Sequence, residues 1–127
     1  MEMQDKVTAV LGASDNPDRY SYKAFHRLID AGHHTIPINP RIGVIEGHPC
    51  YPNLQAAHEH EGPFDTVTVY LKPERSIELL DEIVAISPKR VILNPGSESS
   101  DLQKSLESKE IKVVKDCTLV LLSTDQY

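Results

Sequence analysis

A short apolar run that ends in a turn of small residues is the part of this chain best suited to binding chemistry. The run, Val7–Leu11, is followed by Gly12–Pro17 with the sequence Gly-Ala-Ser-Asp-Asn-Pro, and an amphipathic helix pattern begins at Ser21. In an α/β protein this order predicts a strand, a loop and the start of a helix. Unpaired backbone N–H groups and the positive end of the helix dipole meet at such a loop, and both attract phosphate. The segment therefore indicates a phosphorylated ligand of the nucleotide type.

Two departures from the NAD-binding pattern narrow the type of nucleotide. The loop is not a Gly-x-Gly-x-x-Gly sequence, because Ser14 stands where the second glycine would let a pyrophosphate approach the backbone. The second predicted strand ends in Asn39-Pro40-Arg41, which offers no carboxylate to the ribose hydroxyls of NAD. Arg41 instead favours an additional ribose phosphate, as in NADP or the 3′-phosphorylated ADP of coenzyme A.

Metal and nucleophile chemistry have weaker support in the sequence. His58 and His60 are two residues apart, so on a helix they point away from each other, and we predict no metal site. Neither Cys117 nor Ser14 has an evident base near it, and the charge of Asp116 would raise the pKa of the neighbouring thiol. We therefore predict no catalytic residue and interpret Cys117 as a buried packing residue.

Strand-like and helix-like patterns alternate along the chain. The predicted strands are Val7–Leu11, Thr35–Ile38, Thr66–Tyr70, Arg90–Leu93 and Ile111–Val114, with a short extended piece around His48–Tyr51. The predicted helices are Ser21–Ala31, a weak turn at Leu54–His60, Pro73–Ile86, and Ser100–Lys109 with Ser100 and Gln103 as its capping box. Alternation of this kind predicts a single α/β domain over residues 1–127, Rossmann-like and doubly wound, with a mainly parallel sheet of five or six strands flanked by helices.

Two details of the sheet follow from single residues. Pro37 lacks a backbone N–H, so its position in the second strand should face away from a partner strand. The apolar segment Leu119–Leu122 could complete the sheet or support a homodimer.

Ligands of a doubly wound sheet bind beyond the carboxyl ends of its strands. Four loops follow predicted strands: Gly12–Tyr20, Asn39–Arg41, Leu71–Ser76 and Asn94–Glu98. The candidate cofactor-binding residues are Gly12, Ala13, Ser14, Asn16, Pro17, Tyr20, Lys23, Asn39, Pro40, Arg41, Lys72, Pro73, Ser76, Asn94 and Gly96.

Each of these residues also has an interpretation without a ligand. Gly12 could serve only as the tight turn of a βαβ unit, and Ser14 and Asp15 could cap the following helix. Arg41 and Lys72, taken singly, could be solvated surface charges. These alternatives remain open from the sequence alone.

Composition limits the class of protein. A chain of 127 residues with 39% hydrophobic and 25% charged residues is typical of one globular domain. A formal net charge of −6 and the absence of Trp disfavour nucleic-acid binding. The polar N-terminus and the lack of a long apolar run predict no signal peptide and no membrane helix, and two widely spaced cysteines are typical of a cytoplasmic protein.

Several segments, in this order and at this spacing, resemble the small stand-alone CoA-binding proteins, which are similar to the N-terminal CoA-binding domain of the succinyl-CoA synthetase α subunit. The resemblance covers nearly the whole chain and rests on residues 10–17, 21–23, 28–32, 36–40, 47–54, 65–69, 95–98 and 114–117. It implies a Rossmann-like domain that holds the CoA diphosphate on the Gly12–Pro17 loop. It also implies that the phosphorylated ribose lies near Asn39-Pro40-Arg41, and the pantetheine arm near Lys72-Pro73 and residues 94–96.

Three hypotheses follow. The first is non-catalytic binding of coenzyme A or an acyl-CoA, since the synthetases carry their phosphorylated histidine on a second domain. The second, less favoured, is an NADP-binding oxidoreductase-like domain. The third is a regulatory or interaction protein with a vestigial nucleotide groove.

Overall fold

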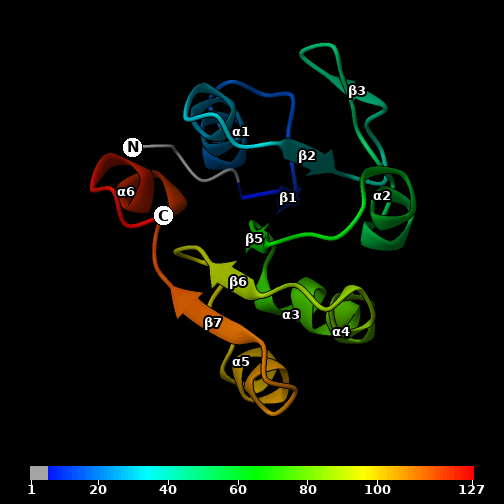
Figure 1. Cartoon of the computed structure of the whole chain (residues 1–127), viewed down its shortest axis with the longest axis vertical. Coiled ribbons are helices and arrows are strands. Elements are labelled where there is room, and N and C mark those ends of the chain that lie inside the picture. The colour runs from blue at the N-terminus through cyan, green and yellow to red at the C-terminus, as the bar shows by residue number, and fades with distance from the viewer. Residues whose placement is uncertain (1–5) are drawn as a thin grey trace.

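A five-stranded parallel sheet with helices on both faces forms the centre of the computed structural model, which describes residues 6–127 (Figure 1). Its strands are β1 (Thr8–Leu11), β2 (Thr35–Ile38), β5 (Thr66–Val69), β6 (Arg90–Leu93) and β7 (Lys112–Lys115). They lie in the order β2-β1-β5-β6-β7, and every neighbouring pair is parallel. From β1 the chain adds β2 on one side, and it then adds β5, β6 and β7 on the other side of β1. This change of side is the arrangement of a doubly wound Rossmann-like fold. The predicted fold class is confirmed, and the sheet has five strands.

The strands are aligned without stagger, so their carboxyl ends meet at one edge of the sheet. Thr8 is level with Thr35 and with Thr66, and Leu11 is level with Ile38 and Val69. Because the four loops that follow β1, β2, β5 and β6 leave from this edge, they come together there.

Two groups of helices cover the sheet. On one face lie α1 (Tyr20–Asp30) and α6 (Thr118–Ser123), which contact each other. On the other face lie α2 (Leu54–Glu61), α4 (Leu80–Ile86) and α5 (Ser100–Glu107), with α4 in contact with both neighbours. None of the helices in residues 6–127 has the length and apolar character needed to cross a membrane.

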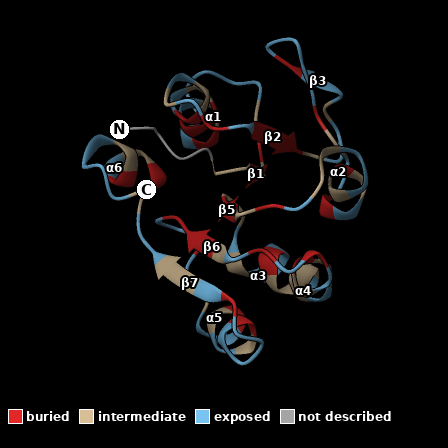
Figure 2. Cartoon of the chain, viewed as in Figure 1, coloured by how far each residue is buried: buried red, intermediate tan, exposed pale blue. Residues whose placement is uncertain are grey.

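The core therefore has two layers, one on each face of the sheet. Strands β1, β2, β5 and most of β6 are buried (Figure 2). On the α2–α4–α5 face, Val67 and Leu93 pack with side chains such as Ile83 and Leu102. On the α1 face, Val10 packs with Phe25. Burial of these apolar side chains is the main source of stability.

A small hairpin protects the outer edge of β2. It consists of β3 (Val44–Ile45) and β4 (His48–Pro49), and the chain after it runs beside β2. Tyr51 donates its backbone N–H to Pro37 O and accepts from Asn39 N. The backbone of Pro37 thus points to the outer edge and away from β1, where its carbonyl accepts a hydrogen bond and no N–H is needed, as predicted.

The segment expected to form one helix from Pro73 to Ile86 is broken. It consists of α3 (Pro73–Ser76), a 3₁₀ turn at Ile77–Leu79, and α4. Ile77 and Leu79 both pack against the core. Residues two apart point to different sides of a straight helix, so a change of direction is needed to bury both.

Three local predictions near the end of the chain were wrong. The cap of α5 is Ser99, whose Oγ accepts from Leu102 N at 3.2 Å, and not a box of Ser100 and Gln103. The Leu119–Leu122 segment does not complete the sheet but lies within α6, because Thr118 and Leu121 at helical spacing are buried. Cys117 is half-buried before α6, with its N–H bonded to the Asp116 carboxylate.

Candidate functional site

A cavity of about 740 Å³ lies at the carboxyl edge of the sheet. This volume falls within the roughly 300–1,000 Å³ range of small-molecule sites. The loop after β1 and the start of α1 form one wall, and the starts of α2 and α4 form the opposite one. Leu11 and Ile38, at the ends of β1 and β2, and the loops after β2, β5 and β6 complete the lining, so all four predicted loops contribute to the cavity.

The loop after β1 is shaped by its own backbone and by short side-chain contacts. Gly12 has a φ of +91°, and a Cβ there would lie 2.6 Å from the carbonyl oxygen of Tyr70. Ser14 Oγ accepts from Asn16 N, and Asn16 Oδ1 accepts from Asp18 N, both at 3.0 Å. Gly12 is therefore required by the fold itself, whether or not a ligand is bound.

The start of α1 is open. Its N-cap is Arg19, whose side chain makes no capping hydrogen bond, and its first turn contains no acidic residue within the described chain. The alternative in which Ser14 and Asp15 cap this helix is thus wrong, because the loop delays the helix start to Tyr20. Arg19, Tyr20 and Ser21 line the cavity, so the first turn of the helix and the positive end of its dipole lie at the cavity.

Asn39 joins the end of β2 to this loop. Its Nδ2 donates to Ala13 O, and its Oδ1 accepts from Arg41 N, each at 2.8 Å. The side-chain amide of Asn39 therefore connects the loop after β1 to the loop after β2 and fixes Arg41 at the rim of the cavity. An aspartate here would lose the donor to Ala13 O.

The cavity concentrates positive charge in an acidic protein. Its lining contains four basic residues, Arg19, Arg41, Lys72 and Arg75, and two acidic ones, Asp18 and Glu82. The whole chain has a formal net charge of −6. Local excess of cations beside an open helix N-terminus is suited to a ligand with several phosphates.

Nine of the fifteen candidate residues from the sequence line this cavity: Gly12, Ala13, Ser14, Tyr20, Asn39, Pro40, Arg41, Lys72 and Gly96. Asn16 and Pro17 lie farther out on the exposed loop. Lys23 is one turn into α1, with its Nζ 5.3 Å from the centre of the Tyr20 ring.

The other three candidates are engaged in the fold. Pro73 begins α3, and the buried Ser76 donates to Pro73 O at 3.3 Å. Asn94 is 1% exposed, donates to Thr68 Oγ1 and Val69 O, and accepts from Thr118 N. Its amide thus connects three segments of the sheet edge, and both of its N–H groups are used.

Sequence reasoning did not single out several lining residues. Arg19 and Arg75 lie within the predicted loops, and the rule that basic residues after strand ends meet phosphate could have found them. Glu82, Leu79 and Asn53 reach the cavity only because α2 and α4 pack together. No local pattern marks them. Tyr70 also lines the cavity, and burial raises the pKa of its phenol to about 12, so it stays protonated at neutral pH.

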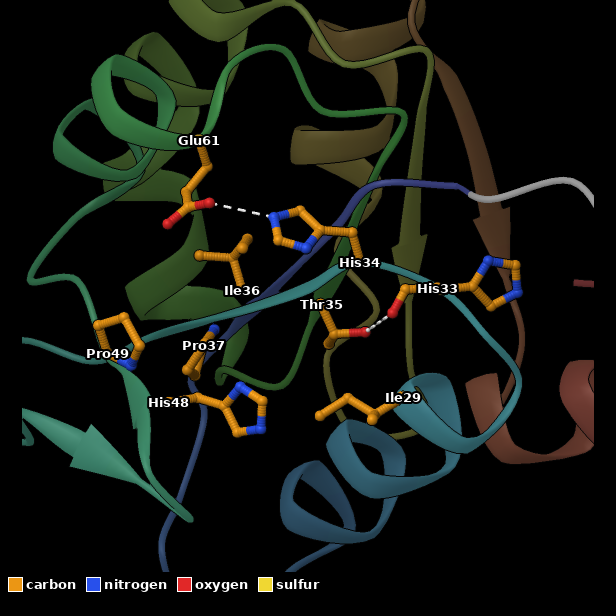
Figure 3. A pocket seen from close by; sticks show the side chains of 9 residues that line it. All are labelled: Ile29, His33, His34, Thr35, Ile36, Pro37, His48, Pro49 and Glu61. Atoms are coloured by element: carbon orange, nitrogen blue, oxygen red, sulfur yellow. Dashed lines mark hydrogen bonds and ion pairs between the residues drawn. The ribbon is translucent and has the colours of Figure 1, made fainter.

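A second cavity of about 230 Å³ lies beside the start of β2, away from these loops (Figure 3). Figure 3 shows His34 facing Glu61 across it, with His34 Nε2 3.0 Å from Glu61 Oε1. Tyr51 OH donates to the other carboxylate oxygen. Within residues 6–127, no three His, Cys, Asp or Glu side chains are grouped so as to hold a metal ion. This cavity contains none of the candidate residues, and we interpret its polar pair as structural.

The Glu61 contacts predict a pH-dependent contribution to stability. Hydrogen bonds from Tyr51 and then His34 lower the pKa of Glu61. A lowered pKa in the folded state stabilises the protein above the usual carboxyl pKa, and this stabilisation disappears as the pH falls through the folded value. Glu61→Gln should lower the free energy of unfolding by about 1 kcal/mol at pH 7, and by less in acid. Urea unfolding at pH 7 and pH 4 tests this, with the exposed Glu59→Gln as control. An equal loss at both pH values would contradict it.

Comparison with known proteins places this chain in a family. The family model described as "CoA binding domain" matches residues 6–123. The chain belongs to this family. The resemblance to the CoA-binding proteins is thereby confirmed, and the matched segment includes all the residues that line the cavity.

Individual relatives share its sequence or its fold. The chain is 29% identical over 113 residues to the uncharacterized protein YneT of Bacillus subtilis, covering 89% of this chain and 82% of YneT. A solved structure of an uncharacterized protein is 35% identical, with a TM-score of 0.86 and coverage of 98% of this chain and 100% of that chain. The dinucleotide-forming acetyl-coenzyme A synthetase 1 of Ca. Korarchaeum cryptofilum, at 19% identity and a TM-score of 0.74, shares the fold over 87% of this chain and 26% of its own.

Proposed function

We propose that this protein binds coenzyme A or an acyl-CoA and holds it without transforming it. The observation that carries the proposal is the uncapped start of α1, which opens into a cavity lined by four basic side chains. Membership of the CoA-binding domain family supports the choice of coenzyme A among phosphorylated ligands.

The three parts of coenzyme A would each contact a different part of the cavity lining. The diphosphate would lie at the first turn of α1, beside the loop after Gly12. The N–H groups of Gly12, Ala13, Asn16 and Asp18 in that loop are already bonded within the protein, so the start of the helix is the better donor. The phosphorylated ribose would lie near Asn39 and Arg41, because an arginine at the rim suits a phosphate monoester. The pantetheine arm would continue past Lys72 towards Gly96.

Ligand-dependent melting tests this proposal and separates it from the alternatives. The melting temperature is measured with coenzyme A, acetyl-CoA, NADP or NAD, all at the same concentration. A ligand present at about 100 times its dissociation constant should add about 2.7 kcal/mol to the free energy of unfolding. We expect coenzyme A and acetyl-CoA to raise the melting temperature, and NAD to leave it unchanged.

Two other outcomes would contradict the proposal. A response to NADP alone would support an oxidoreductase-like domain. No response to any of the four ligands would favour a regulatory or interaction protein in which the cavity has lost its ligand.

A further inference from the structure

Two helices of at least eight residues begin at the cavity, and their N-termini differ. At the start of α1, the side chain of the N-cap residue Arg19 makes no capping hydrogen bond, and the described first turn contains no acidic residue. The first turn of α2 is filled by the protein's own side chains. Asn53 Oδ1 accepts from Ala56 N at 2.8 Å, and the two preceding N–H groups, those of Leu54 and Gln55, donate to a carboxylate from another helix.

That carboxylate belongs to Glu82, in the first turn of α4. Glu82 Oε1 lies 2.6 Å from Leu54 N and 3.2 Å from Gln55 N. The side chain is half-buried and lines the cavity. A negative charge thus already occupies the position that a second phosphate would take at α2, and it is held there by two N–H donors.

The wall around Glu82 is otherwise largely apolar. Pro52, Leu54, Leu71 and Leu79 also line the cavity; Leu54 donates its N–H to Glu82, and Leu79 is three residues before it. The basic residues nearest in sequence, Lys72 and Arg75, are exposed, so water screens their charges more than that of half-buried Glu82. An anionic group is therefore favoured at the α1 wall and disfavoured at the Glu82 wall. The uncharged pantetheine and acyl part of the ligand is suited to the latter.

We infer that Glu82 makes this protein select coenzyme A and thioesters with uncharged acyl groups over thioesters whose acyl group ends in a carboxylate. This inference rests on the proposed function. A carboxylate carried along the apolar wall would meet the fixed charge of Glu82, and juxtaposed like charges are strongly unfavourable in a partly buried site. An acetyl group brings no charge to the same place.

Binding of acetyl-CoA and succinyl-CoA, measured by calorimetry, tests the inference. We expect the unmodified protein to bind acetyl-CoA at least about tenfold more tightly than succinyl-CoA. In Glu82→Gln the difference should fall to about threefold or less, because the side-chain amide oxygen can still accept from Leu54 N but carries no charge. The matched control is Glu78→Gln, an exposed residue of the preceding 3₁₀ turn outside the cavity lining, which should keep the full difference.

The possible outcomes separate this inference from the proposed function. If the unmodified protein binds neither coenzyme A nor acetyl-CoA, the proposed function fails and the inference fails with it. If it binds both but binds succinyl-CoA equally well, only the inference is overturned. That second comparison needs no variant, so a folding defect in Glu82→Gln would not obscure it. A difference that persists unchanged in a folded Glu82→Gln would also overturn the role of Glu82.

Discussion

Gly12→Ala is expected to lower the free energy of unfolding by about 3 kcal/mol or more, which is a large part of the stability of a small domain. Two effects combine. The backbone at Gly12 has a φ of +91°, which an alanine rarely adopts, and the added Cβ would lie 2.6 Å from Tyr70 O. The neighbouring atom is backbone of the segment after β5, so it cannot move without disturbing the sheet edge. Chemical denaturation measures the loss.

Gly47→Ala is the matched control for this change. Gly47 also has a positive φ, +79°, but a Cβ there would meet no atom within 4 Å. We expect a loss of about 1 kcal/mol from backbone strain alone. Equal losses at the two positions would show that contact with Tyr70 does not constrain the loop.

Arg41→Ala is expected to reduce the affinity for coenzyme A about tenfold or more while leaving the affinity for dephospho-coenzyme A almost unchanged. The reason is that Arg41 is placed at the rim by the bond from its own N–H to Asn39 Oδ1, where a ribose phosphate could pair with the guanidinium. Calorimetric titration of each variant with both ligands measures the two affinities.

The control for Arg41 is a second exposed arginine outside the cavity. Arg27→Ala, in the last turn of α1, removes the same charge from the protein without touching the lining. It should leave both affinities close to those of the unmodified protein. Equal losses for the two ligands in Arg41→Ala would remove Arg41 from the proposed contact with the ribose phosphate.

Local patterns in the sequence were sufficient for the architecture. Short β-branched runs such as Thr66–Val69 and the apolar face of Ala24, Phe25 and Leu28 each correspond to a strand or helix of the structure. Alternation of such elements allows few topologies, because parallel strands need right-handed crossovers. The carboxyl edge of the sheet, and with it the general place of a ligand, follows from that topology.

Tertiary packing decided the details that local patterns leave open. The Leu119–Leu122 segment is apolar enough for a strand, and its helical state follows from packing against α1. Asn94 follows a strand as a ligand residue would, yet hydrogen bonds to Thr68, Val69 and the start of α6 bury it. Neither outcome is visible in a short window of sequence, because the partners are distant along the chain.

The sequence by itself determined the alternating elements, the open loop after β1 and the basic residues that follow the strand ends, because each depends on neighbouring residues. Only the tertiary structure brought Glu82 to the start of α2, 28 residues away. It also set Gly12 against the backbone of Tyr70 and left the start of α1 at the cavity without a side-chain cap. These features depend on how helices and strands pack across the sheet, and packing of distant segments has no local signature.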